Sequence, residues 1–430
     1  MSEPTPEVPV GVDLLGPIGR RRFLAAAGVA GGALAATAWI RPSSLFGTAR
    51  AQTTAQALPD GHVLVHIFLR GAADGLSFLP PLGDATYQTV RPGVAVPDAS
   101  ALALDGRFGL HPAAVRLKAL FDSGQAAFVP AAGSPNSNRS HFSAQAMMER
   151  GSATDATITT GWLGRHLAGS ASGSDPVLRG VSIGNGLQAS MRGSEAIATP
   201  NLQSLALTSV GTGGSATQIR TAMASMYAGA DATLLRDGGA AAVDVVDQIT
   251  PIAATARPPS TWPTGFGTAL WPIAKLIADG FPVEVATADL GGWDEHDAMG
   301  SATDPAANQT RLVGGLDTAL GAFFDHIGAA ATRTTVIITT EFGRRIALNG
   351  SGGTDHGRGM VMMVLGAGVA PGVHGAWPGL VDTDHGDVRV VNDYRLVLAE
   401  VLAAHRSGTD LGIVFPDFDS GRSRWLGVMA

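Results

Sequence analysis

The sequence predicts an α/β fold with a mostly parallel central sheet and helices on both of its faces. Apolar runs of strand length, such as residues 63–69 and 335–340, alternate along the chain with segments whose apolar residues recur every three or four positions. Strands that are apolar throughout are typical of sheets buried between two layers of helices. Polar residues also follow several of these runs, at the sheet edge where α/β proteins place their functional groups.

The expected elements follow from these patterns in chain order. We expect strands at residues 63–69, 126–130, 283–288, 335–340 and 361–365. We expect helices at residues 113–122, 140–150, 267–279 and 309–329, and a last helix with Asn392 as its N-cap. The helix at 309–329 has the most regular apolar face, formed by Leu312, Leu316, Leu320, Phe323, Phe324 and Ile327.

The composition limits both the class of protein and the kind of site. The 430 residues are 45% hydrophobic and 15% charged, which is enough for one large core or two modest ones. The net charge of −7 provides no basic surface for nucleic acid, so we expect no nucleic-acid partner. Because the chain has no cysteines, any metal ligand must be a carboxylate, an imidazole, a hydroxyl or a backbone oxygen.

Residues 1–51 have the form of a twin-arginine signal peptide. Residues 20–24 read Arg-Arg-Arg-Phe-Leu, a mildly apolar segment follows, and residues 49–51 form an Ala-Arg-Ala cleavage pattern. An anchor helix is the alternative, although the apolar segment is short for a membrane span. We expect a periplasmic or secreted protein that meets the twin-arginine translocase during export, with residues 52–430 as a single domain. Residues 170–260, rich in Gly, Ala, Ser and Thr, are interpreted as an insertion or cap.

Five acidic or His-bearing clusters carry the candidate chemistry, and four of them follow apolar runs. Strands that end side by side in Asp, Glu or His bring oxygen and nitrogen ligands to one edge of a sheet, as a metal site requires. The chain contains no nucleophile elbow, phosphate-binding loop, dinucleotide fingerprint or His-Glu-x-x-His motif. The clusters contain Asp74; Ser140 with His141; Asp294 with His296; Glu341; and Asp355 with His356.

Ser140 lies at the expected start of a helix, and this position has two interpretations. Serine is a favoured N-cap residue, and that role involves no catalysis. A helix N-terminus also stabilises an alkoxide or a bound oxyanion, so Ser140 could instead be a nucleophile. In that case Arg139 could pair with a phosphate or sulfate group, and His141 could serve as a ligand or base.

Three further clusters have a structural alternative each. Asp294 and His296 point to the same side of an extended segment and could bind one ion, or they could belong to a charged surface loop. Glu341 follows a buried strand and needs either a metal ion or an ion pair with Arg344. Asp74 could be a carboxylate ligand near the sheet edge or part of an Asp-Gly turn.

The last cluster precedes an expected strand instead of following one. It lies in a glycine-rich loop, residues 350–357, and the glycines allow this loop to fold closely over a site. Asp355 could bind a metal ion itself, or it could orient His356 from behind.

In this order, the clusters resemble those of the alkaline-phosphatase/sulfatase-like superfamily. The chain more closely resembles a bacterial family of exported twin-arginine proteins of unknown function, which is often grouped with that superfamily. The resemblance spans essentially the whole mature chain. The motifs that carry it are Phe68-Leu69-Arg70-Gly71-Ala72-Ala73-Asp74-Gly75, Ser140-His141-Phe142, Gly291-Gly292-Trp293-Asp294-Glu295-His296, Thr340-Glu341-Phe342-Gly343-Arg344 and Gly353-Thr354-Asp355-His356-Gly357.

The resemblance implies an exported metal-dependent hydrolase of phosphate or sulfate esters with an alkaline-phosphatase-like core. Ser140 would be the nucleophile. One or two divalent ions, zinc, manganese, magnesium or calcium, would polarise the ester. The implied metal ligands are Asp74, which would bridge or bind an ion; Asp294, His296 and His356, which would hold one ion; and Glu341, which would serve the other.

Two departures from the superfamily pattern leave the metal set open. The superfamily commonly spaces its Asp and His four residues apart, whereas Asp294 and His296 are two apart. It commonly has Asp-His where this chain has Glu341 followed by Phe, so one imidazole is missing. His141 or Asp355 could replace that imidazole, or a single ion could bind. The alternative function is a non-catalytic exported protein that keeps the fold and binds a ligand or assists an envelope partner.

Overall fold

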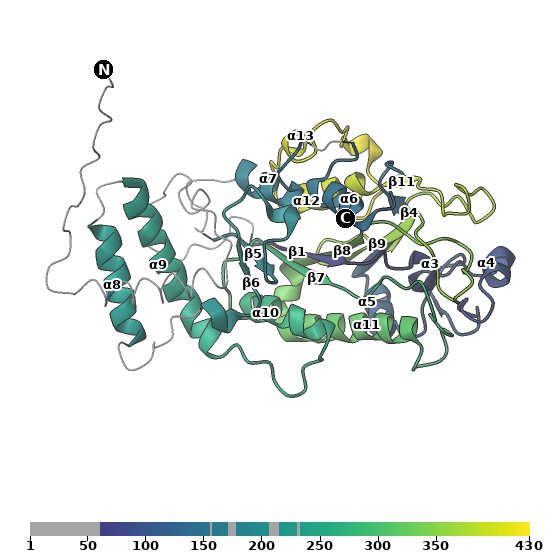
Figure 1. The fold of residues 1–430 in the computed structure, drawn as a ribbon, viewed down its shortest axis with the longest axis horizontal. Helices are drawn as coiled ribbons and strands as arrows, with labels where there is room; N and C mark the ends of the chain where they lie inside the picture. Colours follow the sequence, from purple (N-terminus) through teal and green to yellow (C-terminus); the bar gives the residue numbers. More distant parts are fainter. Residues whose placement is uncertain (1–60, 155–156, 171–177, 206–214, 230–232) are drawn as a thin grey trace, which may run out of the picture.

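Within the residues that the structure describes, a nine-stranded, mostly parallel sheet forms the centre of the computed structural model, and helices cover both of its faces (Figure 1). This arrangement confirms the predicted fold class. The expected export signal, residues 1–51, lies outside the described part of the chain. The structure describes residues 61–154, 157–170, 178–205, 215–229 and 233–430.

The strands lie in the order β10-β4-β9-β8-β1-β7-β5-β6, and β11 pairs with β4. A separate hairpin is formed by β2 (Leu102–Ala103) and β3 (Gly109–Leu110). The strands of the central sheet are β1 (Val63–Leu69), β4 (Ala126–Gly133), β5 (Gly180–Ile183), β6 (Ile197–Thr199), β7 (Val285–Leu290), β8 (Thr334–Thr340), β9 (Met360–Gly366), β10 (Gly372–Val373) and β11 (Asn392–Asp393).

The direction of β9 explains why one cluster precedes a strand. β1 pairs in parallel with both β7 and β8, whereas β9 is antiparallel to β4 and β8. The amino end of β9 therefore lies at the same edge as the carboxyl ends of its neighbours. Residues 355–356, just before β9, thus reach the edge that also receives the segments after β7 and β8.

Alternate residues of β1 pack against opposite helical layers. Val65 and Ile67 belong to the core on one face, and Leu64 and Phe68 belong to the core on the other. All of β1 is buried, and burial on both faces is why the strand is apolar almost throughout. One layer contains α5 (Val115–Asp122), α10 (Phe266–Ala278) and α11 (Asn308–Ile327), and the other contains α6 (His141–Arg150), α7 (Trp162–Gly169) and α12 (Tyr394–His405) (Figure 1).

Each strand and helix expected from the sequence is present, with ends shifted by a few residues. No helix in the described part of the chain is long and apolar enough to cross a membrane. The short helices are α3 (Gly75–Phe78), α4 (Ala85–Val90), α13 (Leu411–Val414) and the 3-10 helices η1 (Ala189–Met191), η2 (Leu202–Leu205), η3 (Gly328–Arg333) and η4 (Arg422–Arg424).

Residues 170–260, interpreted from the sequence as an insertion, also contribute to the central sheet. They supply β5 and β6, which extend the sheet beyond β7. The same stretch forms α8 (Ala216–Ala228) and α9 (Thr233–Ala254), which pack side by side to one side of the sheet (Figure 1). This Gly- and Ala-rich stretch therefore contains two strands of the central sheet as well as a pair of helices.

The N-cap of α12 is Asp393, one residue later than expected. The Asp393 carboxylate accepts a hydrogen bond from the backbone amide of Arg395. Both residues lie in β11, but the side-chain amide of Asn392 donates to the carbonyl oxygens of Pro130 and Ala376. Either residue type can cap a helix, and these bonds engage the Asn392 side chain, which leaves the capping position to Asp393.

At the opposite edge of the sheet, just before β7, the buried carboxylate of Glu284 joins several elements. Its Oε2 accepts from Arg179 at 2.6 Å and from Arg406 at 3.0 Å, and its Oε1 lies 3.0 Å from Nε2 of His166 in α7. Burial alone raises the pKa of Glu284, but the hydrogen bond from His166 and the charge of Arg179 outweigh it and lower the pKa to about 2.

Glu284→Leu should destabilise the protein by about 3–5 kcal/mol, because it leaves two guanidinium groups without this carboxylate. In the wild type the pKa of Glu284 is lower in the folded state than in the unfolded state. The stabilisation that its carboxylate provides is therefore fully present above about pH 4.5 and is lost as the pH falls toward about 2. Urea unfolding at pH 7 and at lower pH measures both effects. Asp325→Asn, which removes an exposed ion pair with Arg116, is the control and should cost about 0–1 kcal/mol. Equal losses for the two variants would contradict the anchoring role of Glu284.

Candidate metal centre

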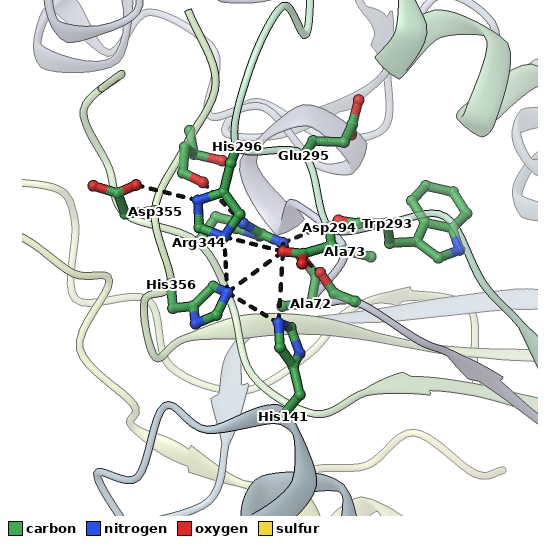
Figure 2. Close-up of polar contacts among 12 residues, drawn as sticks. Ala72, Ala73, His141, Trp293, Asp294, Glu295, His296, Arg344, Asp355 and His356 are labelled. Carbon is green, nitrogen blue, oxygen red and sulfur yellow. Dashed lines mark hydrogen bonds and ion pairs between the residues drawn. The ribbon is translucent and has the colours of Figure 1, made fainter. Parts of the chain in front are cut away.

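Four of the predicted ligands meet at the carboxyl edge of the sheet, and Figure 2 shows them turned toward one another. Asp294 and His296 follow β7, His141 begins α6, and His356 precedes β9. Nε2 of His356 lies 3.0 Å from Nε2 of His141 and 2.9 Å from Nε2 of His296. Oδ1 of Asp294 lies 3.5, 3.1 and 3.4 Å from Nε2 of these rings, in the order His141, His296, His356.

Each of the three imidazoles uses its other ring nitrogen to bind an acceptor. An acceptor beside Nδ1 places the ring proton on that nitrogen and leaves the lone pair on Nε2. All three Nε2 atoms are thereby prepared to act as ligands. The Nδ1 pairs are His141 with Oε1 of Glu341 at 2.7 Å, His356 with the carbonyl oxygen of Arg139 at 2.9 Å, and His296 with Oδ1 of Asp355 at 3.2 Å.

This arrangement fits a divalent cation. Lone pairs that face one another at 2.9–3.0 Å repel unless a positive charge lies between them. Burial, followed by the charges of His141 and Arg344, holds the pKa of His356 below its usual value, which favours the neutral ring. In a tetrahedral site with bonds of about 2.0–2.1 Å, ligand atoms lie about 3.3 Å apart. The separations among His141, Asp294 and His356 are 3.0, 3.4 and 3.5 Å.

The ring of Phe342 packs against two of the candidate ligands. Its centroid lies 5.1 Å from that of His141 and 5.0 Å from that of His356, and the side chain is buried. The contact restrains both imidazoles. A phenylalanine side chain has no donor atom, so Phe342 offers no ligand for a second ion.

Glu341 is engaged by protein groups instead of being open to a second metal ion. In addition to His141, its Oε1 accepts from the Gly71 amide at 2.9 Å and from Nε2 of Gln145 at 2.8 Å. Burial alone raises the pKa of Glu341, but the hydrogen bonds from Gln145 and His141 outweigh it and hold the pKa below its usual value. The charged carboxylate therefore orients His141, and Arg344, the alternative partner considered for Glu341, pairs with Asp294 instead.

Asp74 is likewise occupied. Its Oδ1 accepts from the backbone amides of Leu76 and Ser77 and caps α3, and its Oδ2 binds Nη1 of Arg91 at 2.6 Å. Both side chains of this ion pair are buried. The carboxylate to which the resemblance gave a bridging role between metal ions is thus neutralised by an arginine. The alternative interpretation, an Asp-Gly turn, is closer to the observed local role of Asp74, which is to cap α3.

Ser140 lies exposed at the N-terminal end of α6, one residue before the candidate ligand His141. Its side chain makes no capping hydrogen bond, so capping does not account for the hydroxyl. The guanidinium of Arg139, for which a phosphate or sulfate partner was predicted, forms an ion pair with the buried carboxylate of Asp387. Its contribution to the site is the carbonyl oxygen that binds His356.

The sequence did not identify Gln145 as part of the site, and it indicated Glu341 instead of Asp294 as the partner of Arg344. Gln145 lies four residues after His141, and residues four apart share one face of a helix, so this spacing could have identified it. Arg344 binds Oδ1 of Asp294 at 2.6 Å from a position in the loop after β8. Burial raises the pKa of Asp294, but the hydrogen bond and charge of Arg344 outweigh it, so the pKa lies below its usual value.

A second group of possible ligands in the described residues, His166, Glu284 and His405, fits a metal ion less well. The three side chains are buried, but Arg179 and Arg406 already bind the carboxylate of Glu284. Two guanidinium charges exceed the single carboxylate charge and would repel a divalent cation. We therefore assign this group a structural role.

Two glycines allow the loops of the centre to approach one another. A Cβ atom at Gly71, where φ is +116°, would lie 2.5 Å from the backbone nitrogen of Asp294. A Cβ atom at Gly353 would lie 2.2 Å from the backbone carbonyl carbon of His296. Neither contact is possible in a folded protein, so glycine at these positions sets the distance between the loops that carry the ligands.

The family of the chain follows from a match over most of its length. The model of a family described as "Protein of unknown function (DUF1501)" matches residues 62–404. The chain belongs to this family. Among solved structures, the fold is similar to that of the PsFucS1 sulfatase from Pseudoalteromonas sp., with 12% identity and a TM-score of 0.32 over 89% of this chain and 74% of that chain. A search of curated proteins finds no match.

Gly353→Ala should weaken metal binding by about tenfold or more, because the new methyl group displaces the backbone of His296. Competition with a chromophoric zinc chelator measures the affinity. Gly350→Ala, in the same loop but with nothing within 4 Å of the new Cβ atom, is the matched control. Unchanged zinc affinity in Gly353→Ala would show that the loop contact does not position the centre.

Proposed function

We propose that this chain is a hydrolase of phosphate or sulfate esters that depends on a single divalent metal ion, with zinc as the preferred metal. The observation that carries the proposal is the convergence of three imidazole Nε2 atoms on one carboxylate oxygen, with each Nδ1 bound to an acceptor. Nitrogen-rich ligand sets suit zinc, whereas magnesium, calcium and manganese prefer oxygen donors.

The proposal uses one ion because Asp74 and Glu341, the two buried candidate carboxylates, are engaged by protein groups. Asp74 is paired with Arg91, and Glu341 accepts hydrogen bonds from four groups. His141, Asp294 and His356 would hold the ion, and His296 would add a further donor. A divalent ion bound there supplies Lewis acidity that polarises an ester oxygen and stabilises the charge that develops on it.

Ser140 is the nucleophile in this proposal. Ser140 is the N-cap residue of α6, and His141, a candidate ligand, follows it directly in the chain. The first amides of a helix have no partner within the helix and, with the helix dipole, attract anions. The combination of a cation and a helix N-terminus favours an anionic ester over a neutral one, and Glu341 holds His141 in place throughout.

A non-catalytic ligand-binding protein is the second candidate, and one observation favours it. Arg91 and Arg344 pair with Asp74 and Asp294, the carboxylates to which the resemblance gave metal-binding roles. Such pairs can stabilise a fold whose chemistry has been lost. Metal-dependent turnover would eliminate this candidate.

We also propose export to the periplasm or beyond, with the twin-arginine translocase as a transient partner. The support is the Arg-Arg-Arg-Phe-Leu sequence at residues 20–24 and the Ala-Arg-Ala pattern at residues 49–51. The translocase carries folded proteins, so the metal would be bound before transport. A small or polymeric ester substrate is the remaining partner in this proposal.

His356→Ala should reduce bound zinc from about one equivalent to a small fraction, because it removes the nitrogen that lies nearest to both other rings. Elemental analysis after dialysis measures the content. His385→Ala is the control, since His385 is exposed and lies outside the cluster. Purified wild type that binds no zinc or manganese would refute the proposed function.

Ser140→Ala should lower kcat for the best phosphate or sulfate ester by on the order of 10³-fold or more, because the attacking group is lost. Metal content should be unchanged, which separates this variant from the ligand variants. Ser143→Ala, on the exposed side of the same helix, should retain full activity. Full activity in Ser140→Ala would remove Ser140 from the mechanism.

A further inference from the structure

Arg344 is the most fully bonded charged group at the centre. Its guanidinium is almost completely buried, with 1% of the side chain exposed. An arginine has five N–H donors in a fixed plane. Here five oxygen atoms accept from its three nitrogens: one from Nε, one from Nη1 and three, which share two hydrogens, from Nη2. The acceptors are the carbonyl oxygens of Ala72 and Thr354 at 2.8 Å each, of Trp293 at 3.2 Å and of Gly71, and Oδ1 of Asp294 at 2.6 Å.

We propose that Arg344 is a permanent second cation of the centre: it shares Oδ1 of Asp294 with the metal ion, positions that oxygen, and limits the site to one ion. This inference rests on the proposed function, because it assumes that a metal ion binds. To the proposed function it adds Arg344 as a positioning residue and a stoichiometry of one metal ion per chain. The oxygen that binds Arg344 is the same one that lies 3.1–3.5 Å from the three Nε2 atoms.

The position of the guanidinium explains how one carboxylate oxygen can serve both groups. A carboxylate oxygen has two lone pairs, so it can accept from Arg344 on one side and bind a metal ion on the other. In a two-metal site, a bridging carboxylate joins two ions in the same way. With a fixed positive charge already on Asp294, a second divalent ion at that side of the carboxylate would be repelled.

The five bonds also tie together the loops that carry the ligands. Gly71 and Ala72 belong to the loop after β1, Trp293 and Asp294 to the loop after β7, and Thr354 to the loop before β9. Figure 2 shows Arg344 beside Asp294, at the centre of these segments. A lysine could supply the charge, but it has three donors and lacks the planar fork that reaches several loops at once.

The test measures zinc stoichiometry and affinity by isothermal titration, with a chelator competition for tight binding, in the wild type, Arg344→Gln and Arg344→Lys. We expect one zinc ion in the wild type and a loss of affinity of about 10- to 100-fold in Arg344→Gln. Arg344→Lys should bind one ion with intermediate affinity. Arg345→Gln is the matched control, since its neighbouring guanidinium is partly exposed and bonds to the carbonyl oxygen of His385.

A double-mutant cycle with Asp294→Asn separates positioning from a general loss of structure. If Arg344 acts through Asp294, Arg344→Gln should change zinc affinity by less than about twofold in the Asp294→Asn background. An equal loss in both backgrounds would assign Arg344 a purely structural role and overturn the inference. If Arg344→Gln does not fold, the same cycle is carried out with Arg344→Lys.

The wild-type stoichiometry distinguishes the two proposals. Two zinc ions per chain would overturn the role of Arg344 as the second cation and leave the metal-dependent function standing. No bound metal would refute the proposed function and the inference together. One ion, with wild-type affinity in Arg344→Gln, would refute the inference alone.

Discussion

The geometry of the centre depends on the hydrogen bonds behind the imidazole rings. Glu341, Asp355 and the carbonyl oxygen of Arg139 each bind an Nδ1 atom, and these bonds direct the Nε2 lone pairs of His141, His296 and His356 toward one another. The acceptors are themselves held, since Glu341 accepts from the Gly71 amide and Gln145. The positions of the ligands are therefore set by neighbours that make no contact with an ion.

The sheet could be predicted well because buried strands leave a direct signal in the sequence. The apolar runs at 63–69 and 335–340 are continuous because helices cover both faces. The direction of a strand leaves no such signal, since an apolar run reads the same in parallel and antiparallel pairing. The antiparallel direction of β9 could therefore not be predicted. For the same reason, the sequence could not explain why His356 precedes a strand instead of following one.

Residue types predicted which groups gather at the centre, but not what each of them binds. His141, Asp294, His296 and His356 meet as the clusters suggested. Asp74 and Arg139 are instead paired with Arg91 and Asp387, and no local pattern indicates either pair because both depend on how distant loops fold together. The role of an acidic or basic residue in such a loop is decided by its counter-ion, which the sequence alone does not identify.

The antiparallel strand β9 has a consequence for when the candidate metal centre is complete. His141 and His356 are 215 positions apart, and His296 and His356 are 60 apart, so the cluster closes long loops of chain. Closing such loops costs entropy that the packed sheet must offset. His356 lies beside the other two rings only where β9 pairs with both β4 and β8. An ion that needs His356 as a ligand would therefore bind the completed sheet and not a partly paired one.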